Sequence, residues 1–214
     1  MDQEVEIISS ETRKEKIKNF FINNKKKLIL IILILILVLF GFFSYQIYQD
    51  RNKEQLANKY NKAVITYEKG DKSKIISSMK EIIEDKNKTY SPLALYFLID
   101  NDVIDSNKEI NELFDKILKI KKLDNEIKNL VIYKKALFNS EFEKENNLIK
   151  ILSPILNSES IWKSHALFLM GEYFLNKGEK QKAKEFFEKI INSDNSNINI
   201  KNDARKILLA EFSE

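Results

Sequence analysis

The chain has 214 residues, 32% of them charged, and a formal net charge of +4. It has no cysteine, which excludes disulfides and thiolate chemistry, and its 4 glycines and 2 prolines argue against a turn-rich all-β fold. Residues 1–27 hold 7 basic and 5 acidic residues, so the rest of the chain, with 29 basic and 27 acidic residues, is nearly neutral. No part of it has the clustered basic face of a nucleic-acid-binding protein, and we expect no nucleic-acid partner.

The first predicted element is a transmembrane signal-anchor helix at residues 28–48. Leu28–Phe43 carries no charged or polar side chain, and three lysines stand directly before it. With the residues up to Ile47 the segment reaches 20 residues, about 30 Å of helix, which matches the hydrocarbon core of a bilayer. A core helix of a soluble protein would show polar positions on one side. A cleaved signal peptide would need a small-x-small pattern, which Phe42–Gln46 lacks.

The distribution of basic residues predicts the orientation of this single span. Arg13–Lys27 holds seven basic residues, whereas Gln49–Ala63 holds four. Because cytoplasmic flanks carry the excess of lysine and arginine, we expect residues 1–27 to be a cytoplasmic tail and residues 49–214 to lie across the membrane. The tail leaves two interpretations open. It is either a topogenic charge cluster or an amphipathic helix that touches anionic lipid or a cytoplasmic regulator.

Residues 49–214 are predicted to form one all-α domain. Apolar residues recur there at the i, i+3, i+4, i+7 spacing of amphipathic helices, and no strand-like alternation extends over a useful length. Four such stripes begin at Ile75, Ile110, Leu148 and Ala183. Gly70 and Gly178 lie in two of the turns, where glycine can adopt the left-handed conformation that ends a helix.

A repeat period predicts how these helices pair. Four positions recur at nearly equal intervals, Ala63, Leu98, Ala136 and Gly171, and each is followed at the same distance by a large apolar residue, Met79, Phe114, Leu152 or Phe187. A period of about 34 residues built from paired helices is the signature of tetratricopeptide repeats. We therefore expect four helix-turn-helix hairpins stacked into a superhelix, then a closing helix near Ile200–Phe212, unless Asn202 or Asp203 caps a shorter one.

The last predicted hairpin matches the repeat pattern best. The large, small, aromatic, small and large consensus positions are occupied by Leu167, Gly171, Phe174, Ala183 and Phe187. Ile190 stands where alanine is usual, so we expect looser or shifted packing around it.

The sequence contains no motif for catalysis, for a cofactor or for a metal. His165 is the only histidine, and no cysteine or second histidine exists to complete a zinc site. Asp100, Asp102 and Asp105 resemble a calcium loop, but the required glycine and distal glutamate are missing, so turn and cap roles are expected. We predict a protein that is not an enzyme and that binds no cofactor, metal or small-molecule substrate.

Protein binding is the remaining function class, and the repeat pattern predicts where it would occur. In such stacks the first helix of each hairpin lines the concave surface. By repeat position the predicted binding residues are Tyr133, Leu137, His165, Phe168, Glu172 and Leu175. Aromatic and aliphatic side chains there would suit extended or helical apolar segments, although some of them could instead fill the core between hairpins.

Three short segments, with the single anchor and the repeat spacing, resemble the YfgM-like family. Residues Ile17–Phe21 with Asn24-Lys25 resemble the short cytosolic lead-in of that family. Thr89–Ala94 is similar to the beginning of its second hairpin, and Gly178–Ala183 to its last turn. The similarity extends from about Lys16 to Leu209, although this chain uses isoleucine and lysine where the family is rich in alanine.

This family is the ancillary subunit of the bacterial SecYEG translocon, and it shares its repeat domain with periplasmic cell-division coordinators. The resemblance implies a bacterial inner-membrane protein whose periplasmic domain contacts the Sec translocon, exported polypeptides or periplasmic chaperones. The leading hypothesis is an adaptor that assists the handover of exported proteins to those chaperones. The alternative is a structural or assembly factor of a division or secretion apparatus that never handles client proteins.

Overall fold

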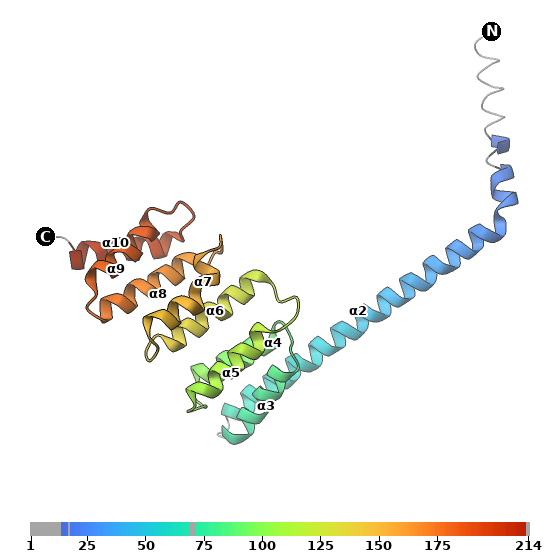
Figure 1. Cartoon of the computed structure of the whole chain (residues 1–214). Helices are drawn as coiled ribbons and strands as arrows, with labels where there is room; N and C mark the ends of the chain where they lie inside the picture. Colours follow the sequence, from blue (N-terminus) through green and yellow to red (C-terminus); the bar gives the residue numbers. More distant parts are fainter. Residues whose placement is uncertain (1–13, 17, 69–71, 213–214) are drawn as a thin grey trace, which may run out of the picture. The chain divides into compact units, whose positions relative to one another are not determined.

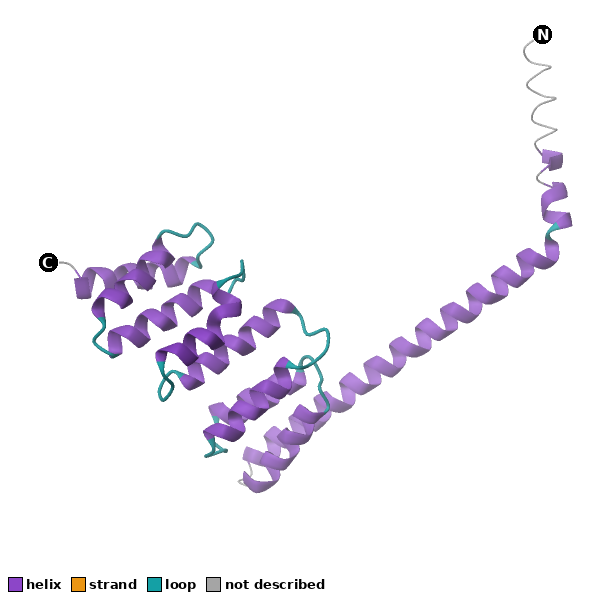
Figure 2. Ribbon diagram, in the orientation of Figure 1, coloured by secondary structure: helices purple, strands orange, loops and turns teal. Residues whose placement is uncertain are grey.

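The computed structural model describes residues 14–16, 18–68 and 72–212 (Figure 1). These residues contain helices and loops and no strand (Figure 2), which confirms the predicted all-α class. The helices are α2 (Lys25–Glu68), α3 (Lys72–Glu84), α4 (Tyr90–Asp100), α5 (Asn107–Leu118), α6 (Asn125–Asn139), α7 (Glu145–Leu156), α8 (Lys163–Asn176), α9 (Lys180–Ile191) and α10 (Ile198–Phe212).

The chain divides into two compact units, residues 1–55 and 56–214, and α2 contributes to both. In the first unit α2 is long and apolar enough to cross a bilayer. Its large apolar side chains from Ile29 to Tyr48 are all exposed, by 45–69%. In water such a surface would be strongly unfavourable, because leaving a large aliphatic or aromatic side chain exposed forfeits the roughly 1.5–3 kcal/mol that its burial would contribute. The predicted span lies within α2.

In the second unit consecutive helices run antiparallel and stack pair upon pair (Figures 1 and 2). The C-terminal part of α2, Leu56–Glu68, precedes α3, and the following pairs are α4–α5, α6–α7 and α8–α9 before the closing α10. The four positions that set the repeat period are buried. Their large apolar partners are buried too, and Met79, Phe114, Leu152 and Phe187 are all 0% exposed.

In the last hairpin, position 171 needs a small residue. A Cβ atom built there would lie 2.6 Å and 2.7 Å from two ring carbons of Phe187. Helix α8 therefore meets the ring of Phe187 on α9 at a distance that only glycine allows. Ile190, which stands where alanine is usual and was expected to loosen the packing here, is fully buried in the core.

Local hydrogen bonds explain where the helices begin and end. Gly178 has φ +75°, its N–H donates to the Leu175 carbonyl at 3.0 Å, and the next N–H, of Glu179, donates to the Phe174 carbonyl at 2.9 Å. This is the Schellman arrangement that the glycine predicted. The equivalent glycine, Gly70, lies outside the described residues.

Turns without glycine use other residues in the same conformation. Asp102 has φ +48°, its N–H donates to the Ile99 carbonyl, and Val103 N–H donates to the Leu98 carbonyl, so Asp102 closes α4. The side chain of Asn197 accepts from two N–H groups in the first turn of α10, so the closing helix begins at Ile198 rather than at Asn202 or Asp203.

The interior of the second unit consists of two hydrophobic clusters that meet inside α6. The first contains buried residues from Ala63 to Val131, and the second contains buried residues from Ile132 to Ala204. Leu118, at the end of α5, packs against both. The junction coincides with the longest of the repeat intervals, between Leu98 and Ala136, where three extra residues separate the two halves of the stack.

Candidate protein-binding surfaces

The structure brings two of the predicted binding residues into one aromatic cluster. Tyr133 of α6 stacks on Trp162 with ring centroids 5.8 Å apart and an interplanar angle of 22°. His165 of α8 lies 5.8 Å from the Tyr133 ring and 5.1 Å from the Trp162 ring. Trp162 was not among the predicted residues, although its position three residues before His165 places it on the same side of the helix. We call these three residues the aromatic cluster.

The other four predicted residues differ in exposure. Leu137 is 42% exposed and Glu172 is also exposed, so both are available to a partner. Phe168 and Leu175 are half-buried and pack against the second hydrophobic cluster, and the Phe168 ring lies 5.5 Å from that of Phe187. Phe168 therefore contributes to packing between α8 and α9, and Leu175 contributes to the second hydrophobic cluster. The binding role of the set stays a prediction.

Partial burial shifts the protonation of this region. It raises the pKa of the Glu172 carboxyl, and it raises the pKa of Tyr133, to which the Glu172 charge adds. Desolvation lowers the pKa of His165, and the carbonyl of Ile161 opposes part of that shift. A charge introduced on His165 is thus unfavourable in the folded protein.

This shift predicts a pH dependence of stability. Because the folded pKa of His165 lies below its unfolded value near 6.5, the unfolded chain binds the proton more readily. The stability contribution is therefore complete above about pH 6.5 and is lost as the pH falls toward the folded pKa. We expect thermal unfolding of the detergent-solubilised chain to lose less stability between pH 7.5 and pH 5.5 in His165→Gln than in the wild type. An equal loss of stability in the wild type and in His165→Gln would contradict this role of His165.

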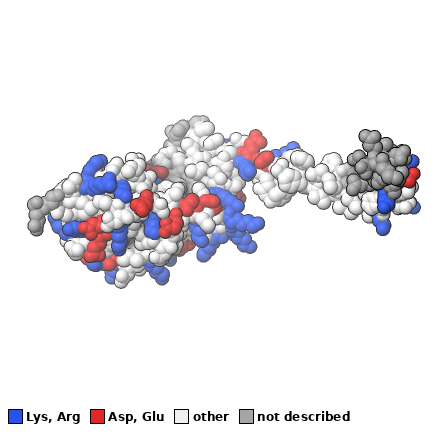
Figure 3. Space-filling view, turned by 90° about the horizontal axis from the view of Figure 1, so that it is seen from above, with Lys and Arg blue, Asp and Glu red and all other residues white. Residues whose placement is uncertain are grey.

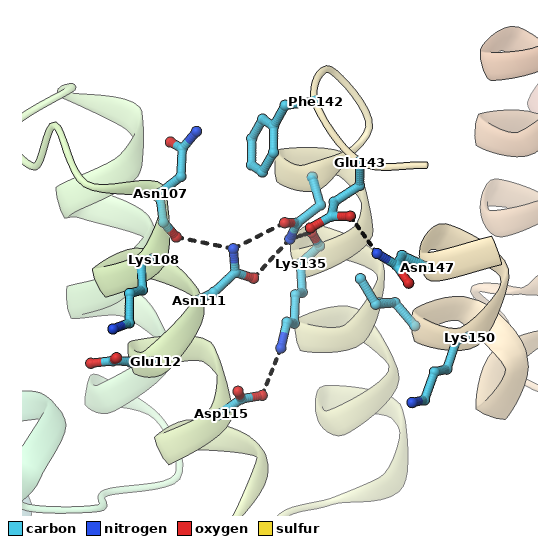
Figure 4. A pocket seen from close by; sticks show the side chains of 12 residues that line it. Asn107, Lys108, Asn111, Glu112, Asp115, Lys135, Phe142, Glu143, Asn147 and Lys150 are labelled. Carbon is cyan, nitrogen blue, oxygen red and sulfur yellow. Dashed lines mark hydrogen bonds and ion pairs between the residues drawn. The ribbon is translucent and has the colours of Figure 1, made fainter. Parts of the chain in front are cut away.

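A groove of about 580 Å³ lies between α5 and α7, at the junction of the two hydrophobic clusters (Figure 4). Twelve residues line it: Asn107, Lys108, Asn111, Glu112, Asp115, Lys135, Asn139, Phe142, Glu143, Asn147, Lys150 and Ile151. The lining contains three lysines and three carboxylates, so positive and negative charges balance in the groove. The sequence contained no signal for it beyond the three extra residues at the junction.

Two asparagines hold the groove together. The Nδ2 of Asn111 donates to Oδ1 of Asn139, and the Nδ2 of Asn139 donates back to Oδ1 of Asn111, both at 2.9 Å (Figure 4). Asn139 is 1% exposed and also donates to the Lys135 carbonyl. Nearby, the Lys135 ammonium pairs with Asp115 at 2.6 Å. These contacts join α5 to α6 across the junction.

The asparagine pair predicts a clear mutational effect. Asn139→Leu removes the two reciprocal hydrogen bonds with Asn111, whose amide then keeps only its bond to the Asn107 carbonyl, and a lost buried partner costs about 1–3 kcal/mol. We expect that loss in the free energy of unfolding. The double variant Asn111→Leu/Asn139→Leu should recover part of it, because no amide is then left unpaired. Additive effects of the two substitutions would show that the pair does not act as a unit.

Elsewhere the surface carries exposed ion pairs and shows mixed charge. Lysine–carboxylate pairs join neighbouring helices of the second unit: Lys59 with Glu81 and Asp85, Lys80 with Glu109, Lys116 with Glu84, Lys182 with Glu145, and Lys180 with Glu211. In the view of Figure 3 basic and acidic side chains are interspersed over the repeat domain. Exposed pairs contribute only about 0–1 kcal/mol each, so they add little to the stability of the stack.

The described residues contain no group of three or more histidine, cysteine or acidic residues that could hold a metal ion. Stacked antiparallel helix pairs, in which each pair buries a large apolar residue at the same repeat position, define a helical-repeat scaffold. The tetratricopeptide repeat-like domain family matches residues 18–208, and the chain belongs to this family. Searches of curated proteins and of solved structures found no match. A domain of this kind is typically a non-enzymatic scaffold for protein–protein interaction, and that is the role that the family indicates here.

Proposed function

We propose that the protein is a membrane-anchored adaptor that mediates protein–protein contacts at the Sec translocon. Residues 1–27 are the cytoplasmic tail, residues 28–48 cross the bacterial inner membrane, and residues 49–214 form the periplasmic repeat domain. The observation that carries the proposal is the exposed apolar stretch of α2, which precedes a domain of a protein-binding family. An apolar helix of this length has no stable place in water.

The assignment to the translocon is supported by the order and spacing of the segments that resemble the YfgM-like family. It is also supported by the chemistry of the first-helix face, the surface formed by α6 and α8, which are the first helices of the last two hairpins. Leu137 is exposed and the rings of the aromatic cluster are half-buried, so together they offer some apolar and aromatic surface, which suits the apolar stretches of exported polypeptides before they fold. Such contacts would allow the adaptor to hand exported proteins to periplasmic chaperones.

A second candidate is a structural or assembly factor of an envelope complex such as a division or secretion apparatus. It is favoured by the half-buried positions of Phe168 and Leu175, which leave less apolar surface for unfolded clients than the repeat pattern predicted. It is also favoured by the mixed charge of the domain face seen in Figure 3, which suits one complementary partner.

Site-specific photo-crosslinking in living cells separates the two. A photoreactive residue replaces Leu137 or Glu172 on the first-helix face, and a matched control replaces the exposed Glu185 on α9. Transient capture of many exported proteins at the first two positions, and not at the control, is expected for the adaptor. Capture of one stoichiometric partner supports the assembly factor, and equal crosslinking at all three positions would overturn both.

The absence of native cysteine makes the topology directly testable. Single-cysteine variants at Lys18 and at Glu185 are treated in intact cells with a maleimide that does not cross the inner membrane. Labelling at position 185 alone is expected for an N-terminus in the cytoplasm. Labelling at position 18 alone would reverse the proposed orientation.

A further inference from the structure

The segment directly before α2 combines exposed apolar side chains with a high density of lysine. Residues 18–23 are helical, and the side chains of Phe20, Phe21 and Ile22 are 57–60% exposed. The rings of Phe20 and Phe21 contact each other edge to face, with centroids 6.0 Å apart. None of the three residues belongs to either hydrophobic cluster of the described chain.

The charge of the same segment has one sign. Between residues 14 and 27 the chain has six lysines and one acidic residue, Glu15. Lys14, Lys16 and Lys18 precede the aromatic pair, and Lys25, Lys26 and Lys27 follow it. Among the described residues, none of these six lysines forms an ion pair. Close cationic side chains repel one another unless an anionic surface lies beside them.

The position of the segment identifies that surface. Phe20 and Ile22 precede Leu28, the first residue of the uncharged run, by eight and six residues, or about 9–12 Å along a helix. When Leu28 lies at the edge of the hydrocarbon, the aromatic pair is therefore within reach of the layer of lipid headgroups. The side chain and N–H of Asn24 both donate to the Phe20 carbonyl, at 2.9 Å and 3.0 Å, at the turn that separates this helical segment from α2.

We infer that residues 14–16 and 18–27 form a docking segment for an anionic membrane surface. Phe20, Phe21 and Ile22 enter the boundary between headgroups and acyl chains, and the flanking lysines contact lipid phosphates. The long lysine side chains reach the headgroups while their aliphatic parts stay near the apolar layer. The occupant is the bilayer itself, because the segment is continuous with the candidate span. This inference rests on the proposed membrane anchoring and adds a preference for anionic lipid.

The test uses the full chain in nanodiscs with single cysteines that carry an environment-sensitive fluorophore. One label replaces Phe21, and a second replaces Leu35 in the middle of the span. The discs contain either phosphatidylcholine alone or phosphatidylcholine with phosphatidylglycerol, and nitroxide lipids report whether each label is in contact with lipid. We expect quenching at position 35 in both compositions and quenching at position 21 that is at least about twofold stronger in the anionic discs.

The two labels test the membrane anchor and the anionic docking segment separately. Lack of quenching at position 35 would overturn the membrane anchor, whereas quenching at 35 with equal signals at 21 in both lipids would overturn only the anionic docking segment. A variant with Lys14, Lys16 and Lys18 replaced by glutamine should lose most of the difference at position 21. An unchanged difference in that variant would show that these lysines do not recognise the lipid.

Discussion

Replacing Leu35 and Leu37 by lysine is expected to remove the protein from the membrane fraction. Both residues lie within the uncharged run and are exposed, by 57% and 63%. A lysine at the centre of a span costs about 2.5–3.5 kcal/mol, whereas each leucine contributes about −0.3 to −0.6 kcal/mol. Two lysines therefore cancel most of the insertion free energy that the whole run supplies.

The measurement is the fraction of protein that resists alkaline carbonate extraction, compared with a Leu35→Ala/Leu37→Ala control. Alanine removes apolar surface without adding charge, so the control should remain in the membrane fraction. Retention of the double lysine variant at the wild-type level would contradict the assignment of α2 as a span. It would then point to an exposed apolar helix covered by another protein.

Phe187→Ala is expected to cause the largest loss of folding stability, about 3–5 kcal/mol. The ring is 0% exposed, contacts Phe168 at 5.5 Å between centroids, and fills the space in front of Gly171. Its removal leaves a cavity between α8 and α9, the two helices of the last hairpin. The free energy of unfolding of the solubilised chain measures the effect, and Ile161→Ala, at a side chain 67% exposed, is the matched control.

A second substitution shows whether the contact between Gly171 and Phe187 is the cause. In the wild type, Gly171→Ala brings a methyl group against the ring and should cost about 1–3 kcal/mol, as overpacking of a core does. In the Phe187→Ala background that ring is absent, and the same change should instead stabilise the helix by up to about 1 kcal/mol. An identical effect in both backgrounds would show that the two residues are not coupled.

The division of the domain into two hydrophobic clusters bears on how partners are bound. The predicted binding residues all lie on α6 and α8, beside the second cluster, whereas the part of α2 that follows the span packs with the first. The asparagine pair and the Lys135–Asp115 ion pair join these two halves across the junction. A partner at the predicted residues would be connected to the candidate membrane span through this polar contact region and the shared helix α6.

Several features were predictable because they depend on residues close together in the chain. The run Leu28–Phe43 is apolar on all sides, so its length alone predicts a helix that could span a bilayer. The i, i+3, i+4 stripes and the constant distance from each of the four repeat positions to its large apolar partner predict paired helices, because helical periodicity and a short turn determine which residues face one another. The left-handed turn at Gly178 followed from glycine itself, which lacks the Cβ that disfavours this conformation.

Other features depend on contacts between residues far apart, which no local pattern encodes. Asn111 and Asn139 lie on different helices, and only the packing of α5 on α6 brings their amides into reciprocal contact. The stacking of Tyr133 on Trp162 needs α6 and α8 to be neighbours, and the half-burial of Phe168 depends on how α9 lies against α8. The sequence alone determined the helices, their pairing and the candidate anchor, because periodicity and hydrophobicity act locally. Tertiary packing decided which of the predicted surface residues stay exposed, because burial depends on the neighbouring helices.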